Sequence, residues 1–180
     1  MSEILVLDPS TTRCGLALFR EGTLVAAGCV KNTLGTKADI LARVVHMAEA
    51  CADWYNDFGA DPTEIVVEWP PVYSPNQERK GGPKSVIALA GVCGALAMTI
   101  GCRCTSYLPA DWTQQVPKNK AVKGAKKSPR AVKILSRLTQ SERVVWDSIK
   151  YDDAIDAIGI GLWHLGRLDR RRVFPGSSEG

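Results

Sequence analysis

The chain contains 180 residues, of which 45% are hydrophobic and 23% charged, and its formal net charge is +4. This composition supplies one domain with a substantial core, leaves little room for a second, and excludes a membrane-spanning segment because no apolar run is long enough.

The six cysteines are scattered without a Cys-x-x-Cys pair, so we expect free thiols rather than disulfides or a zinc site. No signal-peptide pattern opens the chain, which favours a cytoplasmic location. We expect one domain over residues 1–168 and a basic, disordered tail over residues 169–180.

The positive charge is concentrated in the last third of the chain. Met1 to Pro117 contains 9 basic and 12 acidic residues, whereas Lys118 to Gly180 contains 14 basic and 7 acidic residues. Such an asymmetry favours a polyanion as the binding partner.

Three short apolar runs open the chain and predict a strand followed by an antiparallel hairpin. The first run, Glu3 to Leu7, is typical of a strand buried on both faces and ends at Asp8. Gly15 to Phe19 and Leu24 to Val30 are joined by Arg20-Glu21-Gly22-Thr23, which supplies the glycine that a tight reversal favours.

The next segment alternates between helix and strand. Apolar residues at helical spacing predict a helix over Lys37 to Phe58, with Gly59 as its stop. Thr63 to Val67 predicts a buried strand that ends at Glu68, and the Pro- and Gly-rich stretch from Pro70 to Pro83 predicts a mobile loop.

The remaining elements complete an α/β pattern. Lys84 to Ile100 predicts a helix that is apolar nearly all round and rich in small residues, so it is either a central helix or a dimer interface. A strand over Arg103 to Leu108, a short helix or turn opening at Pro109, and helices over Ser128 to Leu138 and Ser148 to Leu168 follow. This element order is that of the ribonuclease H-like fold, a five-stranded mixed sheet flanked by helices.

Four carboxylates fall where this fold can bring them together. Asp8 and Glu68 each end a predicted central strand, and Asp153 and Asp156 share one helix face at i and i+3. Hard oxygen ligands suit Mg²⁺, with Mn²⁺ as a substitute, and two ions roughly 3.5–4 Å apart hydrolyse phosphodiesters without a protein nucleophile. Taken singly, Asp8 is also typical of a turn after a strand, and Asp152 or Asp153 of a helix N-terminus. The four acids together favour a two-metal site.

Three motifs carry a resemblance to a known family. Ile4-Leu5-Val6-Leu7-Asp8-Pro9-Ser10 with Gly15-Leu16-Ala17, then Val66-Val67-Glu68, then Asp153-Ala154-Ile155-Asp156-Ala157 resemble the motifs of RuvC-like Holliday junction resolvases. The resemblance runs from about Ile4 to Leu165. It implies a homodimer in a bacterial or phage-infected cytoplasm that nicks opposed strands of a four-way DNA junction symmetrically.

The resemblance also implies residues that contact DNA. A lysine before the last helices acts at the scissile phosphate, and Lys127 matches it best, with Lys118 as a second candidate. An aromatic residue after the second acid stacks on opened bases, which favours Tyr73 over the alternative that it packs locally. Seven cations and no acid lie in the sixteen residues from Lys118 to Lys133, typical of phosphate contact or of a solvated loop. The expected DNA contacts are Tyr73, Arg79, Lys80, Lys84, Lys118, Lys120, Lys123, Lys126 and Arg130.

Three alternatives stay open. A nuclease of the same fold could act on RNA–DNA hybrids or flaps, and the basic run fits those substrates equally well. A junction-binding protein could keep the fold without the chemistry, although the complete carboxylate set argues against it. Asp8 to Thr12 followed by Gly15 also resembles the first phosphate loop of sugar kinase and actin-like ATPases, but these need a second domain for which 180 residues leave no room.

Overall fold

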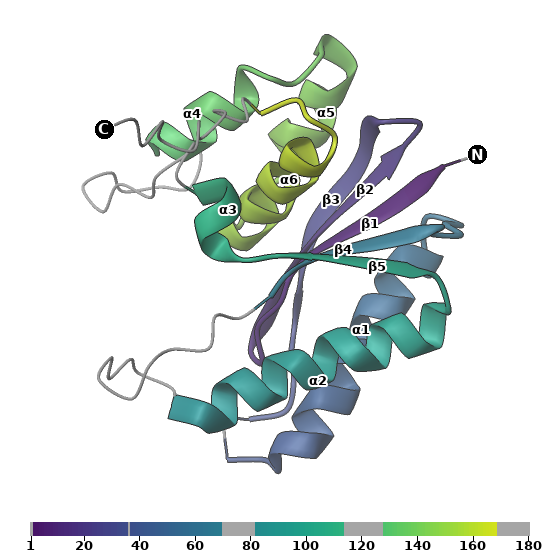
Figure 1. The fold of residues 1–180 in the computed structure, drawn as a ribbon, viewed down its shortest axis with the longest axis vertical. Helices are drawn as coiled ribbons and strands as arrows, with labels where there is room; N and C mark the ends of the chain where they lie inside the picture. Colours follow the sequence, from purple (N-terminus) through teal and green to yellow (C-terminus); the bar gives the residue numbers. More distant parts are fainter. Residues whose placement is uncertain (1, 36, 70–81, 114–127, 169–180) are drawn as a thin grey trace, which may run out of the picture.

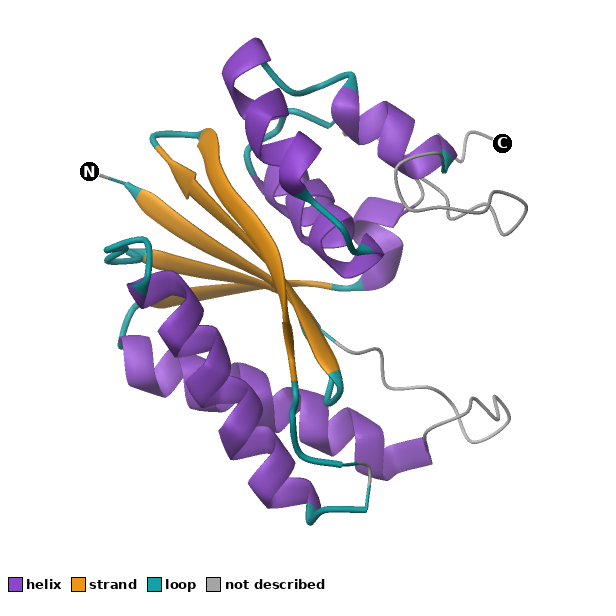
Figure 2. Cartoon of the chain, turned by 180° about the vertical axis from the view of Figure 1, so that it is seen from behind, coloured by secondary structure: helices purple, strands orange, loops and turns teal. Residues whose placement is uncertain are grey.

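A computed structural model describes residues 2–35, 37–69, 82–113 and 128–168, and the side chains of residues 82–85 are not described. The chain forms a central five-stranded sheet with helices on both faces (Figures 1 and 2). Helices α1 and α2 cover one face, and α3 to α6 cover the other (Figure 1). The predicted α/β class and mixed sheet are therefore confirmed. The tail over residues 169–180 and most of the loop predicted from Pro70 lie outside the described residues.

The sheet has the strand order β3-β2-β1-β4-β5. β1 pairs antiparallel with β2 and parallel with β4, while β2–β3 is antiparallel and β4–β5 parallel. The turn between β2 and β3 has positive φ at Glu21 (47°) and Gly22 (75°), the backbone that a tight hairpin reversal requires. The strand bounds are β1 Glu3–Asp8, β2 Arg13–Arg20, β3 Thr23–Lys31, β4 Glu64–Glu68 and β5 Arg103–Tyr107.

Local capping interactions explain where several helices begin. The Asp39 side chain accepts hydrogen bonds from the first turn of α1, and Ser128 does the same for α4.

Among the described residues, none of the helices combines the length and the hydropathy needed to cross a lipid bilayer. The helix bounds are α1 Ile40–Asn56, α2 Gly82–Ile100, α3 Pro109–Thr113, α4 Pro129–Leu135, α5 Gln140–Ser148 and α6 Asp152–His164.

The last helix was predicted over Ser148 to Leu168, but α6 covers only Asp152–His164. Helix α5 precedes it and was not predicted, and extended backbone at Ile149 (ψ 133°) and Tyr151 (ψ 143°) separates the two helices. The sequence does signal α5, because Thr139 and Glu142 form a capping box at its start. Two boundaries also differ: α4 ends at Leu135 and not at Leu138, and α2 begins at Gly82, inside the predicted loop.

Side chains of β1 alternate between two separate cores. Ile4 and Val6 belong to the core under α6, whereas Leu5 and Leu7 belong to the core under α1 and α2. Because alternation continues to the end of the strand, Asp8 falls on the α6 face. All six cysteines are free, as predicted.

Helix α6 lies directly on β2 because glycine occupies each point of closest approach. A Cβ atom on Gly15 would lie 2.0 Å from the carbonyl oxygen of Asp153, and one on Gly161 would lie 2.2 Å from the Phe19 ring. Residues 154 to 162 of α6 are all buried. The helix is therefore the centre of its layer, and its first turn is pressed against the sheet.

A buried carboxylate joins α5 to its surroundings. Glu142 is fully buried and accepts hydrogen bonds from the Leu24 amide (2.8 Å), the Thr139 amide (2.7 Å) and Arg167 Nη2 (2.6 Å). Burial alone would raise the pKa of Glu142, but the hydrogen bonds from Arg167, Leu24 and Thr139 outweigh it and lower the pKa to about 2. Arg167 also donates to the Gly22 carbonyl (3.0 Å), so the hairpin, α5 and the end of α6 are held together.

We predict that Gly15→Ala destabilises the protein by about 1–3 kcal/mol or more, because the new methyl meets backbone that cannot move aside alone. Urea unfolding measures the change. Gly94→Ala is the matched control, since a Cβ there meets nothing within 4 Å and alanine favours a helix. Equal stability of Gly15→Ala and the unchanged protein would contradict the close packing of α6 on β2.

Candidate functional site at the carboxyl ends of β1 and β4

Two carboxylates lie side by side where neighbouring parallel strands end. Leu7 of β1 is paired with Val67 of β4, so Asp8 and Glu68 are the next residues on the two strands. Adjacent strands lie about 4.8 Å apart. Both residues follow the alternation of the α6-side core, to which Val6 and Val66 belong. Asp8 and Glu68 therefore project from neighbouring positions on the same face.

Asp8 and Glu68 begin a row of neighbouring residues that runs across the strands, and this row leads to a third acid. Gly15 pairs with Asp8 on one side and with Cys29 on the other. The backbone of Asp153 rests on Gly15, and the Cys29 thiol donates to Asp153 Oδ2 at 3.8 Å. The first turn of α6 thus places Asp153 over the row that contains Asp8 and Glu68.

The connection behind Asp8 is held by α1 and β3. Arg43, which is 9% exposed, donates through Nη2 to the carbonyl and the hydroxyl of Thr11, both at 3.0 Å. The backbone N–H of Asn32, directly after β3, donates to the Thr12 carbonyl at 3.0 Å. The loop that leaves Asp8 is consequently tied down on two sides, which restricts the direction in which Asp8 projects.

Asp153 lies at the edge of the site and contacts a surface cation. Arg13 Nε is 3.4 Å from Asp153 Oδ2, and the two side chains are 48% and 31% exposed. An ion pair with this exposure adds little stability. Burial and the charge of Asp153 raise the pKa of Cys29 to about 11, so Cys29 is a neutral thiol at physiological pH.

The other acids are joined through a buried chain of contacts. Trp112 of α3, 1% exposed, donates its indole N–H to Glu68 Oε2 at 2.7 Å. The Arg130 guanidinium of α4 lies over the Trp112 ring, 4.7 Å from its centroid. Arg130 Nη1 then donates to Asp156 Oδ1 at 2.8 Å, with both side chains 6% exposed. Glu68 of the sheet and Asp156 of α6 are therefore linked by Trp112 and Arg130.

This chain of contacts changes one of the sequence predictions and adds a residue that the sequence did not indicate. Arg130 was predicted to contact DNA, but it is 5% exposed and serves an internal ion pair, so we do not retain it as a DNA contact. Trp112 was missed, because nothing in the sequence relates a residue after β5 to the end of β4. The remaining predicted DNA contacts stay predictions. The Lys84 side chain is not described, and Tyr73, Arg79, Lys80, Lys118, Lys120, Lys123, Lys126 and Lys127 lie outside the described residues.

Asp8, Glu68 and Asp153 lie along one edge of the sheet, but the four predicted metal ligands do not surround one point. Within the described ranges, no group of three or more His, Cys, Asp or Glu side chains is arranged to hold a metal ion. Arginines contact both predicted ligands on α6, Asp153 at the surface and Asp156 in the core. The carboxylates of Asp8, Glu68 and Asp153 provide the hard oxygen donors that Mg²⁺ and Mn²⁺ require. The donor chemistry of the row fits such an ion, and a fourth ligand at Asp156 needs Arg130 to release it.

Comparison with known proteins adds evidence for the fold. Neither family models nor curated protein sequences match the chain. Among solved structures, T. thermophilus RuvC in complex with a Holliday junction substrate superposes with a TM-score of 0.60 at 17% identity, covering 92% of this chain and 93% of that one. Thermus thermophilus RuvC in a separate structure gives 0.52 at 17% identity, covering 91% and 93%. The yeast mitochondrial Holliday junction resolvase Ydc2 gives 0.52 at 15%, covering 89% and 76%.

The topology and the superpositions agree on the architecture. The sheet order and the helices on both faces make this an α/β protein of ribonuclease H-like fold. Within that class, the chain has the fold of RuvC and Ydc2 over nine-tenths of its length. The resemblance inferred from the three sequence motifs is thereby confirmed at the level of the fold.

We predict that Arg130→Met destabilises the protein by about 3–5 kcal/mol, because it removes one member of a buried ion pair and leaves the other in the core. Urea unfolding at neutral pH measures the loss. The double variant Arg130→Met/Asp156→Leu should recover much of it, since it replaces both charges of the pair by apolar side chains.

Arg103→Met is the control for that variant. The Arg103 side chain is 77% exposed and its Nε lies 3.6 Å from Glu64 Oε1, so its removal should cost less than about 1 kcal/mol. Similar losses for the two arginines would show that Arg130 and Asp156 do not form a buried pair in solution.

Proposed function

We propose that the protein is a metal-dependent endonuclease that resolves four-way DNA junctions. The observation that carries this proposal is the row of Asp8, Glu68 and Asp153, built from two adjacent strand ends and the first turn of α6. It occurs in the fold of RuvC, a protein whose structure is known with a Holliday junction substrate. A row of carboxylates at a sheet edge suits phosphodiester hydrolysis.

Two magnesium ions, or manganese in their place, are the cofactors that this donor set supports. Asp8, Glu68 and Asp153 would hold them, with Asp156 as a further ligand after release from Arg130. When bound, the ions would activate water and offset negative charge on the phosphodiester. The Trp112 N–H holds one oxygen of Glu68, so the other carboxylate oxygen has a restricted range of directions.

DNA contacts and a homodimer complete the proposal. Lys127 would act at the scissile phosphate, Tyr73 would stack on opened bases, and the lysines from Lys118 to Lys126 would hold the backbone. Helix α2 offers the dimer surface, because it packs on α1 yet leaves Ile87 70% and Met98 86% exposed. Two copies related by a twofold axis would place two sites on opposed strands.

A substrate panel tests the proposed function. Labelled four-way junction, flap, duplex and RNA–DNA hybrid are incubated with the protein in Mg²⁺, in Mn²⁺ and in EDTA. We expect paired, symmetric nicks in the junction that depend on the divalent ion. Cleavage of hybrid or flap without cleavage of the junction would overturn the resolvase assignment. Junction binding without cleavage of any substrate would point to the inactive binding protein.

Substitution of the acids forms the second half of that test. Each acid is replaced by its amide, in the variants Asp8→Asn, Glu68→Gln, Asp153→Asn and Asp156→Asn. Cleavage should fall by at least about 100-fold in each, because loss of a metal ligand costs more than loss of a residue that only hydrogen-bonds to a ligand. Junction binding in EDTA should be retained. Asp152→Asn is the matched control, because Asp152 lies in the same turn of α6 but is exposed. Full activity in any of the four would remove that residue from the site.

We predict that Trp112→Phe weakens Mn²⁺ binding by about 10–100-fold, because Glu68 loses the hydrogen bond that orients it. Calorimetric titration with MnCl₂ alone measures this without reference to cleavage. Trp146→Phe is the control, since Trp146 is 2% exposed in the same core and the same atoms are removed. If both variants bind Mn²⁺ equally well, Trp112 has only a packing role.

A further inference from the structure

Besides the basic run from Lys118 to Lys133, a second group of cations lies beside the row of acids, at the start of β2 and the end of β3. Arg13 and Lys31 are register partners, two residues beyond the pair Gly15 and Cys29, so they project on the same face of the sheet. Both cations lie near the ring of Tyr151, the N-cap residue of α6. Lys31 Nζ is 4.8 Å from the ring centroid, and the Arg13 guanidinium carbon is 5.9 Å from it.

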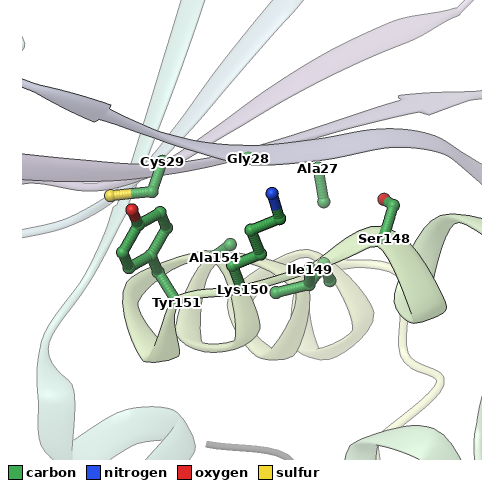
Figure 3. A pocket seen from close by; sticks show the side chains of 8 residues that line it. All are labelled: Ala27, Gly28, Cys29, Ser148, Ile149, Lys150, Tyr151 and Ala154. Atoms are coloured by element: carbon green, nitrogen blue, oxygen red, sulfur yellow. The ribbon is translucent and has the colours of Figure 1, made fainter.

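A shallow pocket extends this group along β3. It lies between β3 and the connection from α5 to α6, with Cys29 and Tyr151 at one end (Figure 3). The Lys150 side chain extends from the connection toward β3, over the small residues Ala27 and Gly28 (Figure 3). The pocket therefore has a floor without bulky side chains and a cation reaching into it.

Three exposed cations contribute to this surface: Arg13, Lys31 and Lys150. Among the described acids, Asp153 contacts Arg13, and Asp147 and Asp152 are exposed in the helices on either side of Lys150. If Asp153 holds a divalent ion, as proposed above, the surface becomes more positive. Such a surface suits a polyanion.

We infer that Arg13, Lys31, Lys150 and Tyr151, here called the Tyr151 patch, bind the phosphate backbone of a DNA strand next to the cleaved bond. This inference rests on the proposed function. It adds a DNA-binding surface that the sequence motifs did not indicate, on the β3 side of the acids.

The position of the patch favours a nucleic acid strand, rather than a compact anion, as its ligand. The row of acids runs from Glu68 on β4 to Asp153 above β2 and β3. Trp112 and Arg130 place α3 and α4 on the Glu68 side, and the sequence between those helices carries the basic run. A strand whose phosphate reaches the acids continues in two directions, and the Tyr151 patch provides cations at the opposite end of the row from Glu68.

Salt-dependent DNA binding tests the inference. The variant Lys31→Gln/Lys150→Gln removes two charges and keeps polar side chains of similar length. The control Arg103→Gln/Arg143→Gln removes two exposed charges elsewhere, on β5 and α5. Fluorescence anisotropy with a labelled four-way junction and a labelled duplex, in EDTA over a series of salt concentrations, gives the slope of log affinity against log salt.

We expect the patch variant to bind severalfold more weakly and its slope to fall in magnitude by up to about 1.8, which is about 0.9 for each phosphate that a lysine no longer neutralises. The control should retain the slope of the unchanged protein. Equal changes in both variants would overturn the patch, because they would reflect net charge alone.

The outcomes also separate this inference from the proposed function. Junction cleavage in Mg²⁺ with no effect of the patch variant keeps the function and overturns the patch. DNA binding that depends on the patch, without cleavage, keeps the patch and overturns the function. A protein that binds no DNA in EDTA overturns the patch, and if it also cuts no junction, the function falls with it.

Discussion

The packing of the first turn of α6 on Gly15 is the constraint on which the site depends. Any side chain at this position would collide with the Asp153 carbonyl, so glycine is what allows the helix to rest on the sheet. The same packing brings Asp153 above the row formed by Asp8 and Glu68. Because Gly161 repeats the close approach against Phe19, the helix is held along its length and its first turn cannot tilt away. Packing of small residues thus determines the geometry of an acidic site.

Carboxylates gathered at one edge repel each other, and the protein offsets this in three ways. The N-terminus of α6 favours the negative charges of its first turn. Arg13 at the surface and Arg130 in the core each contact one acid of the helix. Trp112 donates to Glu68 and supports Arg130 with its ring, so a neutral side chain links Glu68 to the ion pair of Arg130 and Asp156. A divalent cation at this site would replace arginine contacts rather than enter a region that has no positive charge.

Local and non-local information contribute differently to this fold. Strand ends at Asp8 and Glu68 were predictable because apolar runs stop there and turn residues or Trp-Pro-Pro follow. The break between α5 and α6 was not, because the apolar stripe of α6 continues back through Ile149, whose side chain is buried although its backbone is extended. The burial of Arg130 was not predicted, for a related reason. A cation inside a basic run is typical of a solvated surface, and only the position of α4 against Trp112 and Asp156 buries it.

Local sequence patterns are enough to predict the fold class and the candidate acids. Hydrophobic periodicity and turn residues are local properties, and the three motifs carry a resemblance that the superposition with RuvC confirms for the fold. The side chains that contact the acids are known only from the three-dimensional packing. Trp112, Arg130, Arg13 and Tyr151 come from four separate segments, and their contacts follow from strand register and helix packing. Those depend on residues distant in the chain, so no local pattern could have revealed them.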